Sequence, residues 1–174
     1  MRLFIAIPLP TDVRRAVAAA QARLVESGAE GRFVPRENFH ITLHFIGESD
    51  RLSDAVEAIQ VSVSDIRPFV LRLGEYGGFG GKNGKTGFLT VYSDTTELKL
   101  LYETLESALW ERGFSKNRST LSPHITLGRN VVNDEAFVLE KQTAAFTVTE
   151  LVLYESTSVG GRMRYAPLHR ERIQ

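Results

Sequence analysis

The sequence repeats itself after 84 residues, and this repeat constrains the fold more than any other feature. The tetrapeptide His-Ile-Thr-Leu begins at His40 and begins again at His124. The same offset aligns the apolar segment Leu3–Ile7 with a second one within Phe88–Tyr92, and it aligns the helical patterns that follow them. A single ungapped offset that matches strand, helix and motif indicates two copies of one β-α-β-β unit.

Hydrophobic periodicity predicts the elements within each unit. The predicted strands are Leu3–Ile7, Phe39–Ile46, Phe69–Leu73, Phe88–Tyr92, one that starts with His124–Leu127, Phe146–Tyr154 and Met163–Leu168. The predicted helices cover residues 13–27, about 50–64 and about 95–112, and the loops cover 29–37, the glycine-rich Gly74–Gly87 and 114–123. This order lacks the regular alternation of a doubly wound parallel sheet, so it favours an α+β fold with antiparallel sheets.

Two such units can pack about a pseudo-two-fold axis. We therefore expect one bilobal α+β domain over residues 1–174, in which two antiparallel sheets flank a central cleft and the helices lie outside. The lobes are expected to be intertwined, with the first motif lobe around 1–87 and the second around 88–174. The two motif strands would then face each other across the axis.

The composition excludes several classes of site. The chain has no cysteine, which excludes a disulfide framework, a zinc–thiolate site and a cysteine nucleophile. Lys and Arg number 21, as do Asp and Glu, so the net charge gives no hint of a polyanionic partner. The apolar start is short and contains Pro8 and Pro10, and no stretch approaches the roughly 18 apolar residues that span a bilayer. We expect a cytoplasmic monomer with no membrane contact.

The repeated motif supplies a set of side chains suited to phosphodiester chemistry. Because side chains alternate along a strand, His40 and Thr42 share one face, as do His124 and Thr126. One imidazole can take a proton from an attacking water while the other gives a proton to the leaving oxygen. The hydroxyls can donate hydrogen bonds to the phosphate oxygens. A single His-x-Thr usually marks an ordinary half-exposed strand, but its duplication within a repeat favours a catalytic site.

Four further residues are candidates for substrate binding. We expect Arg129 on the same face as His124, where it would extend the site toward a phosphate. Lys85, in the glycine-rich segment, could contact an RNA backbone together with other basic residues. Phe33 and Tyr165 could each stack on a base or simply pack, and the sequence leaves both interpretations open.

A metal site is not expected. His40 and His44 would share a strand face, and His124 could approach them. However, four residues of extended chain separate the first two by roughly 13 Å, which is too far for one ion.

The motifs taken together resemble those of a known family. The segments that carry the likeness are RLFIAIPLP at 2–10, RFVPRENFHITLHFIGE at 32–48, SPHITLGR at 122–129, LYES at 153–156 and YAPL at 165–168. They resemble the two-histidine (2H) phosphoesterase superfamily, and within it the RNA 2′,3′-cyclic phosphodiesterases, also called 2′-5′ RNA ligases. The likeness has three departures: Phe33 where tryptophan is usual, His44 where lysine is frequent and Gly128 where alanine is common.

The resemblance implies hydrolysis of RNA 2′,3′-cyclic phosphate ends to 2′-phosphates without metal, ATP or other cofactor. It also implies a reverse reaction that joins such an end to a 5′-hydroxyl through a 2′-5′ bond. By position, His40 would protonate the leaving 3′-oxygen, His124 would be the base for water, and Thr42 and Thr126 would hold phosphate oxygens. Sequence symmetry alone does not assign the two histidine roles.

Two other functions remain open at this stage. One is a non-catalytic module that binds RNA or nucleotides in the same cleft. The other is a cyclic phosphodiesterase for small molecules such as nucleotide or ADP-ribose cyclic phosphates, which the neutral net charge mildly favours.

Overall fold

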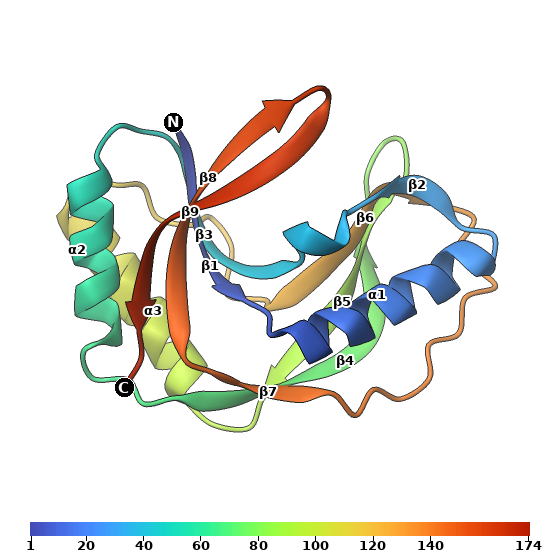
Figure 1. Ribbon diagram of the computed structural model, residues 1–174, viewed down its shortest axis with the longest axis horizontal. Helices are drawn as coiled ribbons and strands as arrows, with labels where there is room; N and C mark the ends of the chain where they lie inside the picture. The colour runs from blue at the N-terminus through green and yellow to red at the C-terminus, as the bar shows by residue number, and fades with distance from the viewer.

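The computed structural model describes residues 1–174, and its strands form two antiparallel sheets (Figure 1). The four-stranded sheet has the order β3 (His40–Glu48), β1 (Arg2–Pro8), β8 (Glu150–Val159), β9 (Arg162–Arg172). The five-stranded sheet has the order β2 (Glu30–Phe33), β6 (His124–Val132), β5 (Lys85–Ser93), β4 (Phe69–Phe79), β7 (Ala145–Val148). The predicted α+β fold with two antiparallel sheets is confirmed.

Three α-helices cover the outer faces of the sheets. Helices α2 (Leu52–Val63) and α3 (Glu97–Glu111) lie side by side against the four-stranded sheet (Figure 1). Helix α1 (Thr11–Glu26) lies along the five-stranded sheet, and Gln21 on α1 donates a hydrogen bond to the Leu127 carbonyl of β6 at 2.9 Å. A short 3-10 helix, η1 (Arg36–Asn38), leads into β3. None of the helices has both the length and the apolar character required to cross a membrane.

Each sheet contains strands from both halves of the chain. In the four-stranded sheet β1 and β3 pair with β8 and β9, and in the five-stranded sheet β5, β6 and β7 join β2 and β4. A boundary near residue 87 therefore separates the two repeats in the sequence but does not separate the two sheets. One cause of this mixing in the five-stranded sheet is the short hairpin that joins β4 of the first half to β5 of the second. Antiparallel strands with such a connection pair with each other.

The glycine-rich segment is mostly strand, so its prediction as a loop over Gly74–Gly87 is wrong. Strand β4 continues to Phe79 and β5 begins at Lys85, which leaves residues 80–84 as the turn. The glycines make room for side chains of the neighbouring strand. A Cβ atom at Gly87 would lie 2.5 Å from the hydroxyl oxygen of Tyr76, which only glycine avoids.

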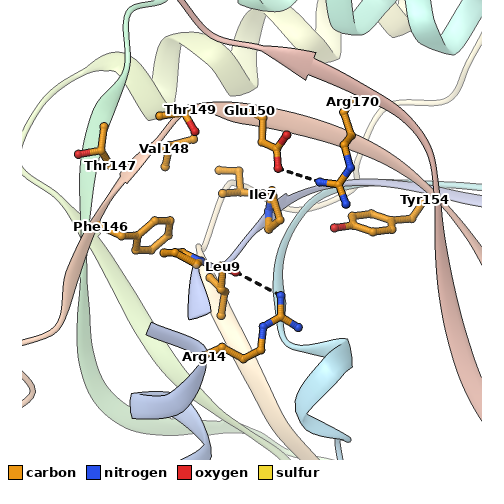
Figure 2. A pocket seen from close by; sticks show the side chains of 12 residues that line it. Ile7, Leu9, Arg14, Phe146, Thr147, Val148, Thr149, Glu150, Tyr154 and Arg170 are labelled. Carbon is orange, nitrogen blue, oxygen red and sulfur yellow. Dashed lines mark hydrogen bonds and ion pairs between the residues drawn. The ribbon is translucent and has the colours of Figure 1, made fainter. Parts of the chain in front are cut away.

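Two other predicted elements differ from the structure. The single strand predicted over Phe146–Tyr154 is divided at Thr149 into β7 and β8, which belong to different sheets, and Figure 2 shows this corner. The division arises because the Thr149 carbonyl accepts a hydrogen bond from Ile173 rather than continuing the β7 ladder. The loop predicted over 29–37 contains β2 and the start of η1, because polar residues hide the short edge strand from a periodicity search.

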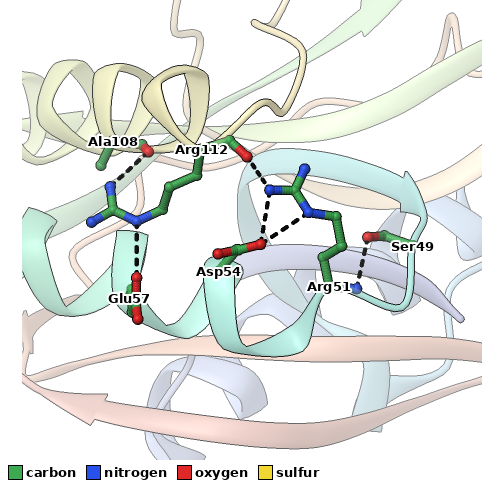
Figure 3. A network of polar contacts seen from close by, with 6 residues as sticks. All are labelled: Ser49, Arg51, Asp54, Glu57, Ala108 and Arg112. Atoms are coloured by element: carbon green, nitrogen blue, oxygen red, sulfur yellow. Dashed lines mark hydrogen bonds and ion pairs between the residues drawn. The ribbon is translucent and has the colours of Figure 1, made fainter.

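A polar network joins the end of α3 to the start of α2 (Figure 3). Arg51 donates to the carboxylate of Asp54 at 2.9 Å and to the Arg112 carbonyl, and Arg112 donates to Glu57 at 3.4 Å. These groups are largely exposed, so each ion pair contributes little to stability. The apolar seam beneath them contributes more, because three leucines of α3 are fully buried: Leu101, Leu105 and Leu109.

This seam predicts opposite outcomes for two adjacent leucines. Leu101 has no exposed surface, whereas Leu100 is 47% exposed. We expect Leu101→Ala to lower the free energy of unfolding by about 2–5 kcal/mol, because it leaves a cavity, and Leu100→Ala to change it by less than about 0.5 kcal/mol. Urea unfolding followed by circular dichroism measures both. Equal losses for the two variants would contradict the helix orientation described here.

Candidate active site

Both motifs begin a strand at the same cleft. His40 is the first residue of β3 and His124 the first of β6, and these two strands approach each other between the sheets. A cavity of about 550 Å³ lies there, and both histidines line it together with Thr42 and Thr126. The structure thus brings the four motif side chains to one cavity, two from each sheet.

The two imidazoles are held by equivalent hydrogen bonds, each from Nδ1 to the backbone carbonyl two residues earlier. Nδ1 of His40 lies 2.7 Å from the Asn38 carbonyl oxygen, and Nδ1 of His124 lies 2.6 Å from that of Ser122. A carbonyl oxygen only accepts, so each Nδ1 carries the proton and each neutral ring leaves Nε2 with a free lone pair. At His40 this nitrogen accepts a hydrogen bond from the Thr42 hydroxyl at 2.8 Å.

The repeat also supplies the packing behind each ring. Phe4 on β1 lies 5.1 Å from His40 between ring centroids, and Phe88 on β5 lies 5.0 Å from His124. These phenylalanines occupy equivalent positions in the two repeats. Both histidines are therefore fixed by a backbone carbonyl at Nδ1 and by an aromatic ring on the adjacent strand.

A β-bulge follows the motif in both strands. Ile5 pairs with His44 and Ala6 with Thr42, so Leu43 is an extra residue in β3. In β6 the register shifts in the same way and leaves Leu127 as the extra residue, at the equivalent position of the repeat. Each bulge reverses the alternation of side chains for the residues that follow it.

The bulge in β6 brings Arg129 into the cavity. A regular strand would place this residue, five positions after His124, on the opposite face. After the extra residue Leu127 it returns to the cleft face and lines the cavity with His124 and Thr126. Simple alternation does not account for this position.

The environment of His40 favours its neutral form. Burial is the largest effect and lowers the pKa of the imidazole, whereas the hydrogen bond to the Asn38 carbonyl raises it by a smaller amount. The nearby guanidinium groups of Arg129 and Arg14 lower the pKa further. In the free protein at neutral pH, Nε2 of His40 is therefore unprotonated.

The bulge in β3 removes His44 from the cleft, so the prediction that His40 and His44 share a face is wrong. His44 is 2% exposed and its Nδ1 is bonded to Glu106 on α3. Asn117 donates from its backbone to Glu106 at 2.9 Å and from its side chain to the Leu43 carbonyl at 2.9 Å. The network thus provides a hydrogen-bond donor for the carbonyl of the bulged residue Leu43. It also anchors the loop between α3 and β6.

The other three predicted substrate-binding residues, unlike Arg129, lie outside the cavity lining. The Tyr165 ring stands edge-on to His40 at 5.3 Å, next to the cavity. Phe33 packs against the backbone of Gly128, where a Cβ would lie 2.9 Å from the ring. The ammonium of Lys85 lies 3.1 Å from the buried Asp134 carboxylate. None of the three residues lines the cavity. Phe33 packs within the five-stranded sheet, and Lys85 pairs with a carboxylate that follows the end of β6.

Sequence reasoning missed several residues that line the cavity. Two are phenylalanines: Phe45, which is 65% exposed, and Phe79, whose ring is edge-on to His124 at 5.4 Å. Others are Tyr102, Asn117 and residues 119–122 of the loop before β6. The repeat itself held a signal for Phe45, because it occupies the position equivalent to Arg129. The loop residues carry no comparable signal.

Comparison with known families identifies this arrangement. The family model described as the 2′-5′ RNA ligase superfamily matches residues 9–160, which include both motifs. The chain belongs to this superfamily.

Relatives within the superfamily cover nearly the whole chain. An RNA 2′,3′-cyclic phosphodiesterase of Thermotoga maritima is 30% identical over 95% of this chain and 100% of its own length. One of Escherichia coli is 30% identical over 97% of this chain and 94% of its own. The structure of Escherichia coli LigT complexed with 3′-AMP superposes with a TM-score of 0.79 at 30% identity, over 99% of this chain and 97% of that one.

The charge environment of His40 gives a direct prediction. We expect Arg129→Gln to raise the pKa of His40, because it removes a positive charge that opposes protonation. A titration of the imidazole signals by NMR measures the shift. Arg118→Gln, in the exposed loop before β6, serves as a matched control and should leave this pKa unchanged. A His40 pKa that is the same in the wild type and in Arg129→Gln would show that the guanidinium does not act on the imidazole.

Proposed function

We propose that this protein is an RNA 2′,3′-cyclic phosphodiesterase that hydrolyses 2′,3′-cyclic phosphate ends to 2′-phosphates. The observation that carries the proposal is the pair of repeat-related imidazoles, each with Nδ1 bonded to a carbonyl and each lining the same cavity. The names of the relatives support the substrate class, as does a LigT structure complexed with a nucleotide.

In the proposed reaction a water attacks phosphorus and the bond to the 3′-oxygen breaks. Nε2 of His124 takes a proton from the water, and Nε2 of His40 gives a proton to the leaving 3′-oxygen. The products are a 2′-phosphate and a 3′-hydroxyl. With a 5′-hydroxyl in place of water as the attacking group, the same residues would join two ends through a 2′-5′ bond.

This assignment requires His40 to gain a proton when substrate binds. Its pKa is lowered in the free protein, which disfavours a proton donor. A bound cyclic phosphate brings a negative charge to the cavity, and a nearby anion stabilises an imidazolium. We propose that substrate binding raises the pKa of His40 in this way, so that the ring takes up a proton from solvent and the acid forms only in the complex.

The remaining cavity residues fit supporting roles. The hydroxyls of Thr42 and Thr126 can donate to the non-bridging oxygens, and Arg129 can balance the charge that develops on them. Phe45 offers an exposed ring at the cavity on which a base can stack. Because one chain supplies both histidines, which can act as acid and base, we propose that the protein acts as a monomer and needs no metal ion. We also propose that it acts in the cytoplasm.

One assay separates this function from its alternatives. The protein is incubated, in EDTA, with cytidine 2′,3′-cyclic phosphate and with a short RNA that ends in a 2′,3′-cyclic phosphate, and the monophosphate formed is identified. We expect a 2′-phosphate from both. Turnover of the nucleotide alone would indicate a small-molecule enzyme, and binding without turnover would indicate a non-catalytic module.

Substitution of either cavity histidine should abolish most of the activity. We expect His40→Ala and His124→Ala each to lower kcat about 10²–10⁴-fold, the range typical for loss of a general acid or base. His169→Ala is the matched control, since His169 lies on β9, pairs with Glu171 and does not line the cavity. A near-normal rate in His40→Ala would refute the two-histidine mechanism.

Substrate binding should also raise the pKa of His40. His124→Ala would bind cytidine 2′,3′-cyclic phosphate without turning it over, and this ligand carries one negative charge across the neutral range. We expect NMR titration of the complex to give a higher His40 pKa than in the same variant without ligand. By linkage, the affinity should increase as the pH falls between these two values. An affinity independent of pH would exclude His40 as the group protonated on binding.

A further inference from the structure

A second cavity, of about 300 Å³, lies outside the active site and shares no lining residue with it. Figure 2 shows its walls, which are the turn from β1 into α1, the corner between β7 and β8, and the side chains of Tyr154 and Arg170. Its apolar floor includes Ile7, Leu9 and Phe146. The mechanism proposed above uses none of these residues.

The polar groups of this cavity are mostly donors. Arg14 and Arg170 contribute two guanidinium groups, and Glu150 contributes the one carboxylate, bonded to Arg170 at 2.8 Å. Two positive charges against one negative charge leave an excess that an anion can balance. Arg170 retains further N–H donors after this bond, since a guanidinium carries five.

Tyr154 adds an O–H group at the same place. Its side chain lines the cavity between Arg170 and Leu9, and burial raises the pKa of its hydroxyl, which keeps the proton in place as a donor. Its ring stacks on Phe4 at 5.1 Å, and Phe4 in turn lies 5.1 Å from the ring of His40. Only one aromatic ring therefore separates this cavity from the first motif histidine.

From these contacts we infer that the second cavity binds a phosphate group through Arg14, Arg170 and the Tyr154 hydroxyl. Phosphate matches the site because guanidinium groups and a hydroxyl donate to its several oxygens, and because its charge exceeds that of the Glu150 carboxylate. The group can come from an internucleotide phosphate of a bound RNA or from free inorganic phosphate. The first source rests on the proposed function, and the second does not.

Arg14 links this site to the active site through the backbone. Its guanidinium donates to the carbonyls of Arg36 and Glu37, at 3.3 and 2.9 Å, and also to that of Leu9 at 3.2 Å. The next residue, Asn38, provides the carbonyl that holds His40. A phosphate bound to Arg14 would thus sit against the segment that orients the first histidine.

Inorganic phosphate titrated into the isotope-labelled full-length protein tests the site without any turnover. We expect the NMR signals of Tyr154 and of the Arg170 side chain to shift saturably, separately from signals of the active-site cavity. Arg170→Gln should weaken this binding about tenfold or more, the effect of losing a charged hydrogen bond, and Tyr154→Phe should weaken it less. Arg129→Gln should weaken phosphate binding only as reported by the signals of the active-site cavity.

Arg15→Gln is the matched control, because it removes an exposed charge from the neighbouring position of α1 and should change neither set of signals. The thermal midpoints of Arg170→Gln and Tyr154→Phe, compared with the wild type, identify any loss of folding. The inference is overturned if the Tyr154 and Arg170 signals of the wild type do not respond to phosphate. It is also overturned if the Tyr154 signal in Arg170→Gln and the Arg170 signal in Tyr154→Phe report the same affinity as in the wild type.

Kinetics then distinguish the two sources of phosphate. If the occupant is an internucleotide phosphate, Arg170→Gln should raise KM about tenfold for a trinucleotide ending in a 2′,3′-cyclic phosphate and leave KM for cytidine 2′,3′-cyclic phosphate unchanged. If the occupant is free phosphate, neither KM should change although phosphate binding is lost. Absence of turnover with both substrates would refute the proposed function while the titration still decides the site.

Discussion

Backbone pairing across the two halves of the chain positions everything in the active site. The last strand of the first repeat, β4, pairs with the first strand of the second repeat, β5, and β8 of the second repeat pairs with β1 of the first. Each histidine strand is thus held in a sheet that the other half of the chain completes. Neither lobe can form its sheet alone, so the two imidazoles keep a fixed relation across the cleft.

The β-bulges then give the two equivalent strands different chemistry. At equivalent positions after the motif, one strand presents Phe45 to the cavity and the other presents Arg129. The two repeats therefore share the same strand and bulge, but only the second places a positive charge in the cavity. The arginine disfavours protonation of His40 in the free protein. We propose that an anionic substrate reverses this preference. The asymmetry gives two similar histidines a basis for opposite roles in one reaction.

Much of this arrangement could be predicted from the sequence, because the repeat and the alternation of side chains are local patterns. They predicted the α+β class, the motif strands and the faces of His40, Thr42, His124 and Thr126. Register between strands is not local, and no glycine or proline marks Leu43 as a bulge. The sequence alone therefore put His44 on the wrong face. Lys85 was predicted to be in a flexible loop because glycine runs are typical of loops, whereas here they admit cross-strand side chains.

The most direct test of the central claim is a crystal structure of the protein with cytidine 2′-phosphate, the proposed product. We predict that the phosphate lies in the 550 Å³ cavity, with Nε2 of His124 within hydrogen-bonding distance of a phosphate oxygen. We also predict that Nε2 of His40 lies within that distance of the ribose 3′-oxygen, on the opposite side of phosphorus. A phosphate held by only one histidine, or bound outside this cavity, would contradict the claim that the repeat provides the acid and the base of one reaction.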